Sequence, residues 1–225
     1  MDFINTLMPN FERLSGELYE CIGQTFTMLA VSGSIAWVLG VAVGVLLTVC
    51  RPGGILENRW LFTIFERGID IIRSIPFIIL IVLLIPVSRF LVGTGSGVTG
   101  SFVALVAGTV PFFARQIESV LADIDHGLIE ASQAMGFSPR EIIFSVYLRE
   151  SIPGITRVTM ITFVSLVGIT AIAGAIGAGG LGDFAIRYGY QMGYRDMIWL
   201  TVIIILLIIS VFQFFGNIII KKSTH

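Results

Sequence analysis

The stretch Met197–Ile220, MIWLTVIIILLIISVFQFFGNIII, contains no charged side chain and decides the fold class. A helix needs about 20 mostly apolar residues to cross a membrane, and this run is long enough. The composition of the whole chain also indicates a membrane protein. Of its 225 residues, 55% are hydrophobic and 13% are charged, and the mean hydropathy is +0.92. One soluble core cannot bury so much apolar surface. The sequence therefore predicts an all-α integral membrane protein, since unbroken apolar runs lack the alternation of a membrane β-barrel.

Four further apolar stretches bring the predicted transmembrane helices to five: Phe26–Val49, Ile71–Val87, Val98–Phe113 and Val158–Ala178. The prolines Pro76 and Pro86 are expected to kink the second stretch and to free backbone carbonyls there. If the polar segment 115–157 is cytoplasmic, ten of the 14 Lys and Arg residues lie inside and four lie outside. Because basic residues favour the inner side, we expect the N-terminus outside and the C-terminus inside.

The first 21 residues have a different pattern from the transmembrane stretches. Apolar residues recur at helical spacing between acidic ones, at Ile4, Leu7, Met8, Phe11, Leu14 and Leu18. This pattern predicts an amphipathic helix that lies on the outer face of the membrane.

The predicted spans lack the groups that an ion-driven carrier uses. The middles of all five contain no Asp, Glu, Lys, Arg or His, whereas proton- or sodium-coupled carriers keep ionisable groups near the bilayer midplane. The chain also lacks the G-x-x-x-x-G-K-[ST] loop that binds nucleotide phosphates. If the protein pumps a substrate, we expect the energy to come from another protein.

Catalytic and metal-binding constellations are also missing from the sequence. No paired intramembrane aspartates, H-E-x-x-H motif or Ser–His pair indicates an enzyme. The two cysteines, Cys21 and Cys50, would lie about 43 Å apart on one helix, which is too far for a disulfide. His126 and His225 are isolated. We therefore expect no enzymatic activity, no cofactor and no metal.

The polar segment 115–157 has the pattern of a helical elbow. Asp125 is expected to cap a short helix that runs to Met135, about 15 Å long, and Gly136 to end it in a left-handed conformation. Ser138, Pro139 and Glu141 then form a capping box that starts a second helix. The small residues Ala131, Ser132 and Ala134 would let another backbone approach the short helix. The elbow is thus either a docking surface or a plain connector between two spans.

Several motifs resemble one family of membrane proteins. Glu130-Ala131-Ser132, followed by Gly136, Leu148 and Pro153, is similar to the EAA loop of ABC importer permeases, although Arg149 stands where the family usually has proline. Three further stretches resemble the methionine-uptake subfamily of these permeases. They are RSIPFI (73–78), VPFFAR (110–115) and GAIGAGGLG (174–182).

The resemblance implies a type I ABC importer transmembrane domain over residues 22–215, with 115–157 as its cytoplasmic coupling loop and 216–225 as a cytoplasmic tail. It implies a multi-pass permease of the bacterial inner membrane that imports D- or L-methionine. The expected partners are a second permease copy, two cytoplasmic ATPase subunits, an extracytoplasmic methionine-binding protein and the lipid bilayer, with no nucleic acid. A permease for osmoprotectants or phosphonates, or a channel-like protein without an ATPase, is the alternative.

The resemblance also assigns candidate roles to individual residues. The ATPase-coupling residues are expected to be Glu130, Ala131, Ser132, Gly136, Ser138 and Glu141. Glu130 would either contact a groove of the ATPase or hold the elbow together. The candidate pore or gate residues are Pro76, Ala171, Gly174 and Gly177, because small residues and helix breaks favour a path through the second and fourth spans. Gly40 and Gly44 would allow close helix packing, either within one subunit or at a dimer seam.

Overall fold

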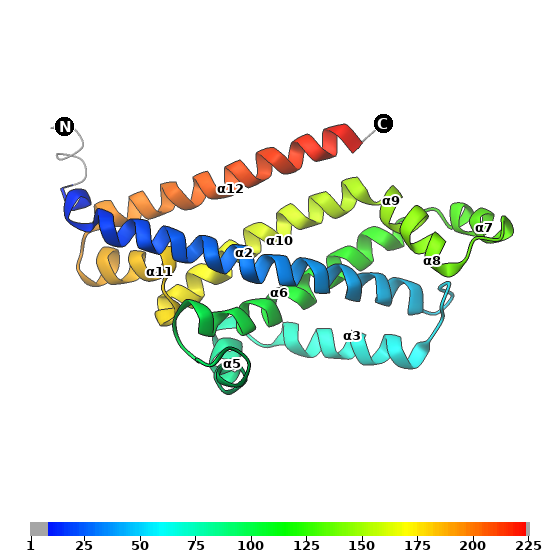
Figure 1. Ribbon diagram of the computed structural model, residues 1–225, viewed down its shortest axis with the longest axis horizontal. Coiled ribbons are helices and arrows are strands. Elements are labelled where there is room, and N and C mark those ends of the chain that lie inside the picture. The colour runs from blue at the N-terminus through cyan, green and yellow to red at the C-terminus, as the bar shows by residue number, and fades with distance from the viewer. Residues whose placement is uncertain (1–8, 224–225) are drawn as a thin grey trace. The chain divides into compact units, whose positions relative to one another are not determined.

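The computed structural model describes residues 9–223, and every regular element in this part of the chain is helical. The elements follow one another in this order: α2 (Phe11–Cys50), α3 (Arg59–Ser74), α4 (Phe77–Leu83), α5 (Ile85–Val92), α6 (Gly97–Ala122), α7 (His126–Ala134), α8 (Pro139–Glu141), η1 (Ile142–Tyr147), α9 (Leu148–Glu150), α10 (Ile152–Ala173), η2 (Gly174–Ala178), α11 (Gly180–Phe184), η3 (Ala185–Gln191) and α12 (Arg195–Ser223). Figure 1 shows them coloured along the chain. The prediction of an all-α protein is confirmed for the described residues.

Four helical segments in the described part of the chain are long and apolar enough to cross a membrane. They are α2, α6, the continuous segment Ile152–Ala178 formed by α10 and η2, and α12. These four contain the predicted first, third, fourth and fifth spans. Helices α2 and α12 run without a break (Figure 1).

The predicted second span, 71–87, is not one helix. It covers the end of α3, all of α4 and the start of α5. Ile75 is extended, with φ −87° and ψ 122°, because a residue before proline is driven out of the helical region. A second break falls at Leu84, where ψ is 0°, just before Ile85 and Pro86 begin α5. Pro76 and Pro86 were expected to kink one helix, whereas in the structure they interrupt it.

The amphipathic N-terminal segment continues directly into the first span. Helix α2 runs from Phe11 to Cys50 with no break near residue 21. Its apolar face there is buried, because Leu14, Leu18 and Cys21 pack against Leu181, Phe184 and Met197. Ile4, Leu7 and Met8 lie outside the described residues. The location of this segment on the outer face of the membrane stays a prediction. At the other end, α12 extends through the predicted tail to Ser223.

The chain divides into two compact units, and α2, α6, α10 and α12 contribute residues to both. The first unit comprises residues up to 35, 76–107 and 163–212, and the second comprises 36–75, 108–162 and 213 onwards. In the first unit, Met28, Leu105 and Leu166 are almost fully buried in one core cluster. A stacked ring pair, Phe163 and Phe212, adds to this unit with centroids 3.6 Å apart.

The second unit contains the polar segment and its own core. Phe113, Ile117 and Leu121 of α6 form a cluster with residues of the elbow and with Val158 of α10. Gly40 and Gly44 of α2 pack against α6 of the same chain: a Cβ at Gly40 would meet Phe113, and one at Gly44 would lie 2.6 Å from Ile117. These two glycines therefore serve packing within one subunit, one of the two roles predicted for them.

Candidate functional site

The short helix of the elbow has the ends that the sequence predicts. Helix α7 begins after Asp125, whose carboxylate accepts a hydrogen bond from the amide of Gly127 at 2.7 Å. At the other end Gly136 has φ +83°. Its amide donates to the carbonyl of Gln133, and the amide of Phe137 donates to that of Ser132 at 3.1 Å. These two bonds close a Schellman motif, in which glycine fits the left-handed position without steric cost.

The second arm of the elbow starts with the predicted capping box. The hydroxyl of Ser138 accepts from the amide of Glu141, and the Glu141 carboxylate accepts from the Ser138 amide at 2.7 Å. The hydroxyl of Ser138 also donates to that carboxylate at 2.7 Å. These hydrogen bonds, first from the hydroxyl and then from the amide, lower the pKa of Glu141.

The second arm, for which the sequence predicts a helix, is not one regular helix. It passes from α8 into a π-helical segment, η1, and then into α9, which ends at Glu150. Ser151 separates this arm from α10, where Pro153 lies in the first turn. Proline is tolerated at this position because the amides of the first turn have no partner within the helix. Arg149 lies exposed in α9.

One face of the elbow packs against the long helix α6 of the same unit. Ile129 of α7 joins Ile142, Val146 and Tyr147 of the second arm in the cluster around Phe113 and Ile117. Tyr147 is among the largest fully buried side chains of the described residues. Helix α7 contacts η1, the π-helical segment of the second arm, and Figure 1 shows where α7 and α8 lie along the chain. Because both arms share one core, the elbow is held as a single body on the end of α6.

The other face of α7 is exposed and combines apolar, small and acidic side chains. Glu130, Ala131 and Ala134 are exposed together with Leu128 and Met135, and Met135 is 67% exposed. Glu130 makes no ion pair or hydrogen bond with any of residues 9–223, so none of these residues uses it to hold the elbow. Ser132 differs from its neighbours, because it is buried and its hydroxyl donates to the carbonyl of Leu128 at 2.8 Å.

An ion cluster joins α6 to α3 at the start of the polar segment. The guanidinium of Arg115 contacts Glu118 at 2.8 Å, Asp70 at 3.1 Å and Glu66 at 3.6 Å. The Arg115 side chain is 22% exposed, so solvent screens it less than a surface pair. The elbow therefore sits on a helix that is tied to α3 by charge.

The glycine-rich stretch GAIGAGGLG (174–182) forms a tight bend in the first unit. The helix leaves regular geometry at Ile176 and Gly177, and Gly177 has φ +95°. Beneath the bend two backbones cross closely: a Cβ on Gly174 would lie 2.6 Å from the Asp183 amide nitrogen. Ala171, another candidate gate residue, is at the same crossing, because a Cβ on Gly182 would collide with its backbone. Gly177 is exposed above this crossing.

Two polar side chains of α2 hold the bend, and neither was predicted from the sequence. Gln24 accepts a hydrogen bond from the Gly180 amide at 2.7 Å, and Thr25 accepts one from the Leu181 amide at 2.8 Å. Thr25 is 4% exposed. The only signal in the sequence is a Gln-Thr pair within an apolar run.

Pro76 is the remaining candidate gate residue, and it lies far from the glycine bend in the sequence. It is the cap residue of α4 and is exposed.

The family model described as "Binding-protein-dependent transport system inner membrane component" matches residues 40–224. A probable D-methionine transport system permease of Vibrio cholerae is 38% identical over 221 residues, which are 98% of each chain. The D-methionine transport system permease of Escherichia coli K12 is 46% identical over 134 residues, which are 60% of this chain and 62% of that one.

Solved structures show the same likeness. The MetNI methionine ABC transporter, in an inward-facing conformation, matches with a TM-score of 0.91 and 40% identity, covering 95% of this chain and 99% of that one. An amino acid ABC transporter solved with histidines matches with a TM-score of 0.77 at 16% identity, covering 96% of this chain and 98% of that one. The second match concerns the fold alone.

Proposed function

Because the chain belongs to the family of binding-protein-dependent transport system inner membrane components, we propose that it is the permease subunit of an ATP-driven methionine importer. It is a multi-pass protein of the bacterial inner membrane with the fold of a type I importer. The observation that carries the proposal is the match to the MetNI transporter over 95% of the chain. The relatives do not favour an importer of osmoprotectants or phosphonates, or a channel without an ATPase.

In the proposed topology the chain crosses the membrane five times. The four long helices supply four crossings, and α4 and α5 with the end of α3 supply a broken fifth. The N-terminus is outside and the C-terminus inside, which leaves ten of the 14 basic residues in the cytoplasm. A broken helix is tolerated in a membrane where neighbouring protein or a water-filled path satisfies the freed backbone groups.

The elbow is the proposed coupling surface for two cytoplasmic ATPase subunits, one on each copy of a permease homodimer. Its shared core with α6 makes it a rigid lever. The exposed face of α7 carries Glu130 and Ala131, which supports a docked partner over an internal bond for Glu130. Ser132 supports the lever from inside, and Gly136, Ser138 and Glu141 fix the angle between its arms. Closure of the ATPases would move the lever and switch the permease between two states.

The proposed path for substrate passes the bend of the fourth span. Ala171 and Gly174 let two backbones meet there, and Gly177 provides a turn that can open or close. Pro76 breaks the second span and frees backbone carbonyls. An extracytoplasmic binding protein would deliver methionine to this side. The uncharged span centres suit a small, largely apolar amino acid that must pass without tight binding.

Two measurements test the proposed function. In a strain without other methionine uptake, expression of the chain with its native neighbours should restore growth on limiting methionine. Purification from the same cells should recover an ATPase in equal amount. Growth that stays methionine-limited although an ATPase co-purifies contradicts the substrate, and purification without an ATPase contradicts the importer.

A further inference from the structure

Helix α3 has one exposed face that neither its packing nor its ion cluster explains. One face is apolar and packs inwards, because Phe62, Phe65 and Ile69 form a cluster with Leu47 and Ala114. A second face carries the two carboxylates that meet Arg115. The third face lines an open pocket of about 360 Å³, formed by Arg59, Trp60, Thr63, Ile64 and Arg67.

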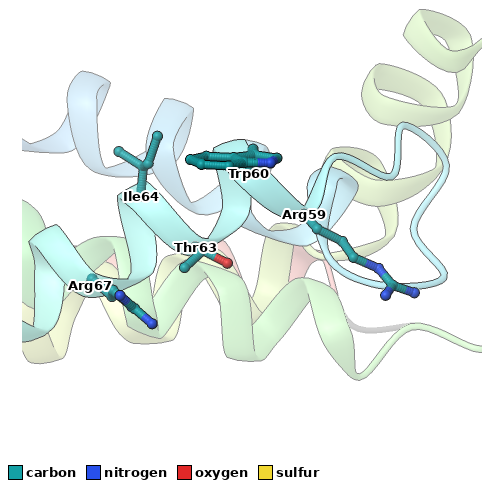
Figure 2. Close-up of a pocket in the computed structure, with 5 residues that line it drawn as sticks. All are labelled: Arg59, Trp60, Thr63, Ile64 and Arg67. Carbon is teal, nitrogen blue, oxygen red and sulfur yellow. The ribbon is translucent and has the colours of Figure 1, made fainter.

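This third face separates hydrogen-bond donors from apolar groups. Arg59, Thr63 and Arg67 follow at four-residue intervals along one edge, and Trp60 and Ile64 lie along the other edge (Figure 2). The apolar side chains are strongly exposed, Trp60 by 82% and Ile64 by 59%. Ile71, two turns beyond Ile64, continues this edge and is 64% exposed. Such side chains avoid water, so the face requires an apolar neighbour beside its cations.

The contacts of α3 place this face at the inner end of the bilayer. Leu47, three residues before the end of α2, packs against Phe62 and Phe65. The first turns of α3 therefore lie level with the cytoplasmic end of the first span in the proposed topology. Arg67 lies about 12 Å further along the helix than Arg59. Helical side chains lean towards the N-terminus, and Figure 2 shows the Arg67 guanidinium directed back along α3.

Both arginines have donors left for a ligand. The Nε of Arg59 pairs with Glu57 at 2.9 Å, and the Arg59 side chain is 78% exposed. Glu57 also accepts from the Gly53 amide at 3.1 Å, so it is fixed and orients Arg59. Arg67 has no ion pair among residues 9–223. With Glu57 included, this face carries one net positive charge.

We propose that this face of α3 binds the headgroup of an anionic phospholipid from the cytoplasmic leaflet. Guanidinium groups bind phosphate oxygens through paired N–H donors. Tryptophan is favoured at the level of the headgroups, and basic side chains near the inner surface attract anionic lipids. Trp60, Ile64 and Ile71 contact the glycerol backbone and the start of the acyl chain. A soluble phosphate would use the arginines and leave this apolar edge in water.

Quenching of Trp60 fluorescence tests the proposal. A Trp37→Phe/Trp199→Phe background leaves Trp60 as the only tryptophan of the full chain. This protein is reconstituted in phosphatidylcholine vesicles that contain a fixed fraction of brominated phosphatidylglycerol or of brominated phosphatidylcholine. We expect brominated phosphatidylglycerol to occupy the site about fivefold more strongly, as one net cation at an anionic surface predicts. The comparison needs no change to the site itself.

Two matched double variants separate the site from general surface charge. Arg59→Gln/Arg67→Gln should abolish the preference for phosphatidylglycerol. Lys221→Gln/Lys222→Gln removes the same amount of charge from the exposed last turn of α12. This variant should keep the preference for phosphatidylglycerol. Equal quenching by both lipids would overturn the proposal. Absence of quenching by either would also overturn it, because a second permease copy or another protein would then cover Trp60. A preference lost to the same extent in both double variants would show only a diffuse surface potential.

Discussion

At the scale of single residues, Gly136 is the position on which the proposed lever depends most. Its φ of +83° is favourable only for glycine, while a Cβ there would meet no neighbour within 4 Å. Gly136→Val therefore introduces backbone strain without a packing clash, at a cost of about 1–2 kcal/mol or more. This cost favours an unlocked elbow by about tenfold. We expect normal membrane insertion and retained ATP hydrolysis, but an about tenfold loss of methionine uptake in proteoliposomes.

Gly136→Asn is the control for this experiment. Asparagine tolerates the left-handed conformation better than any β-branched residue, so it should keep most of the uptake. Uptake at the normal rate by Gly136→Val would show that the turn does not transmit the motion of the ATPases.

A second prediction at this scale concerns the crossing beneath the glycine bend. A Cβ on Gly182 would collide with the backbone of Ala171, which cannot rotate away as a side chain would. Gly182→Ala should therefore destabilise the protein by about 1–3 kcal/mol. Gly168→Ala, in α10, meets nothing within 4 Å and should be neutral or stabilising by up to about 1 kcal/mol. Thermal unfolding in detergent compares the two variants, and equal midpoints would refute the close crossing.

At the scale of elements, the capping box makes the second arm of the elbow sensitive to acid. The hydrogen bonds from Ser138 lower the pKa of Glu141 in the folded state. A carboxyl with a lowered pKa stabilises the fold above its unfolded pKa, and this stabilisation is lost as the pH falls through the folded pKa. We expect hydrogen-exchange protection of residues 138–147 to decrease in this acidic range and to be constant above it.

Two variants test the assignment of this pH dependence. Glu141→Gln keeps an acceptor for the Ser138 amide but cannot titrate, so its protection should not change with acid. Ser138→Ala removes the cap and should weaken protection at every pH, by about 1 kcal/mol. If the acid-dependent step persists in Glu141→Gln, another group causes it.

Elements that depend on local sequence could be predicted, and those that depend on tertiary contacts could not. Both caps of the elbow and the turn at Gly136 are confirmed, because each depends on residues within five positions of one another. The second span was harder, since Pro76 and Pro86 signal a distortion but not whether the chain bends or leaves the helix. The inward orientation of Ser132 follows from the contact of α7 with α6, a tertiary feature.

The hydrogen bonds from the glycine bend to Gln24 and Thr25 could not be predicted from a sequence pattern. Gln24 and Thr25 bind amides 156 residues further along the chain. Thr25 reads as an ordinary helical threonine, and such residues usually bond to their own backbone, as Thr25 also does with Cys21. Only the fold shows that its hydroxyl also accepts a bond from Leu181. The bend itself requires left-handed backbone at Gly177, Gly179 and Gly180, which glycine adopts without steric cost.

At the scale of the whole molecule, we propose that the chain provides the substrate path and the coupling surface, while a separate ATPase provides the energy. Its predicted span centres contain no ionisable side chain, and it lacks a nucleotide-binding loop. The elbow is packed as one body and presents an exposed face with Glu130, which has no bonded partner in the described part of the chain. These features fit a permease that changes state when a separate ATPase pulls on α7. They do not fit a carrier that exploits an ion gradient.

Reconstitution into vesicles tests this central claim most directly. The purified chain alone, with ATP inside and either a proton or a sodium gradient, should accumulate no radiolabelled methionine above the external concentration. Addition of the co-purified ATPase subunits and the binding protein should produce uphill accumulation that requires ATP. Uphill accumulation by the chain alone, driven by either ion gradient, would contradict the account.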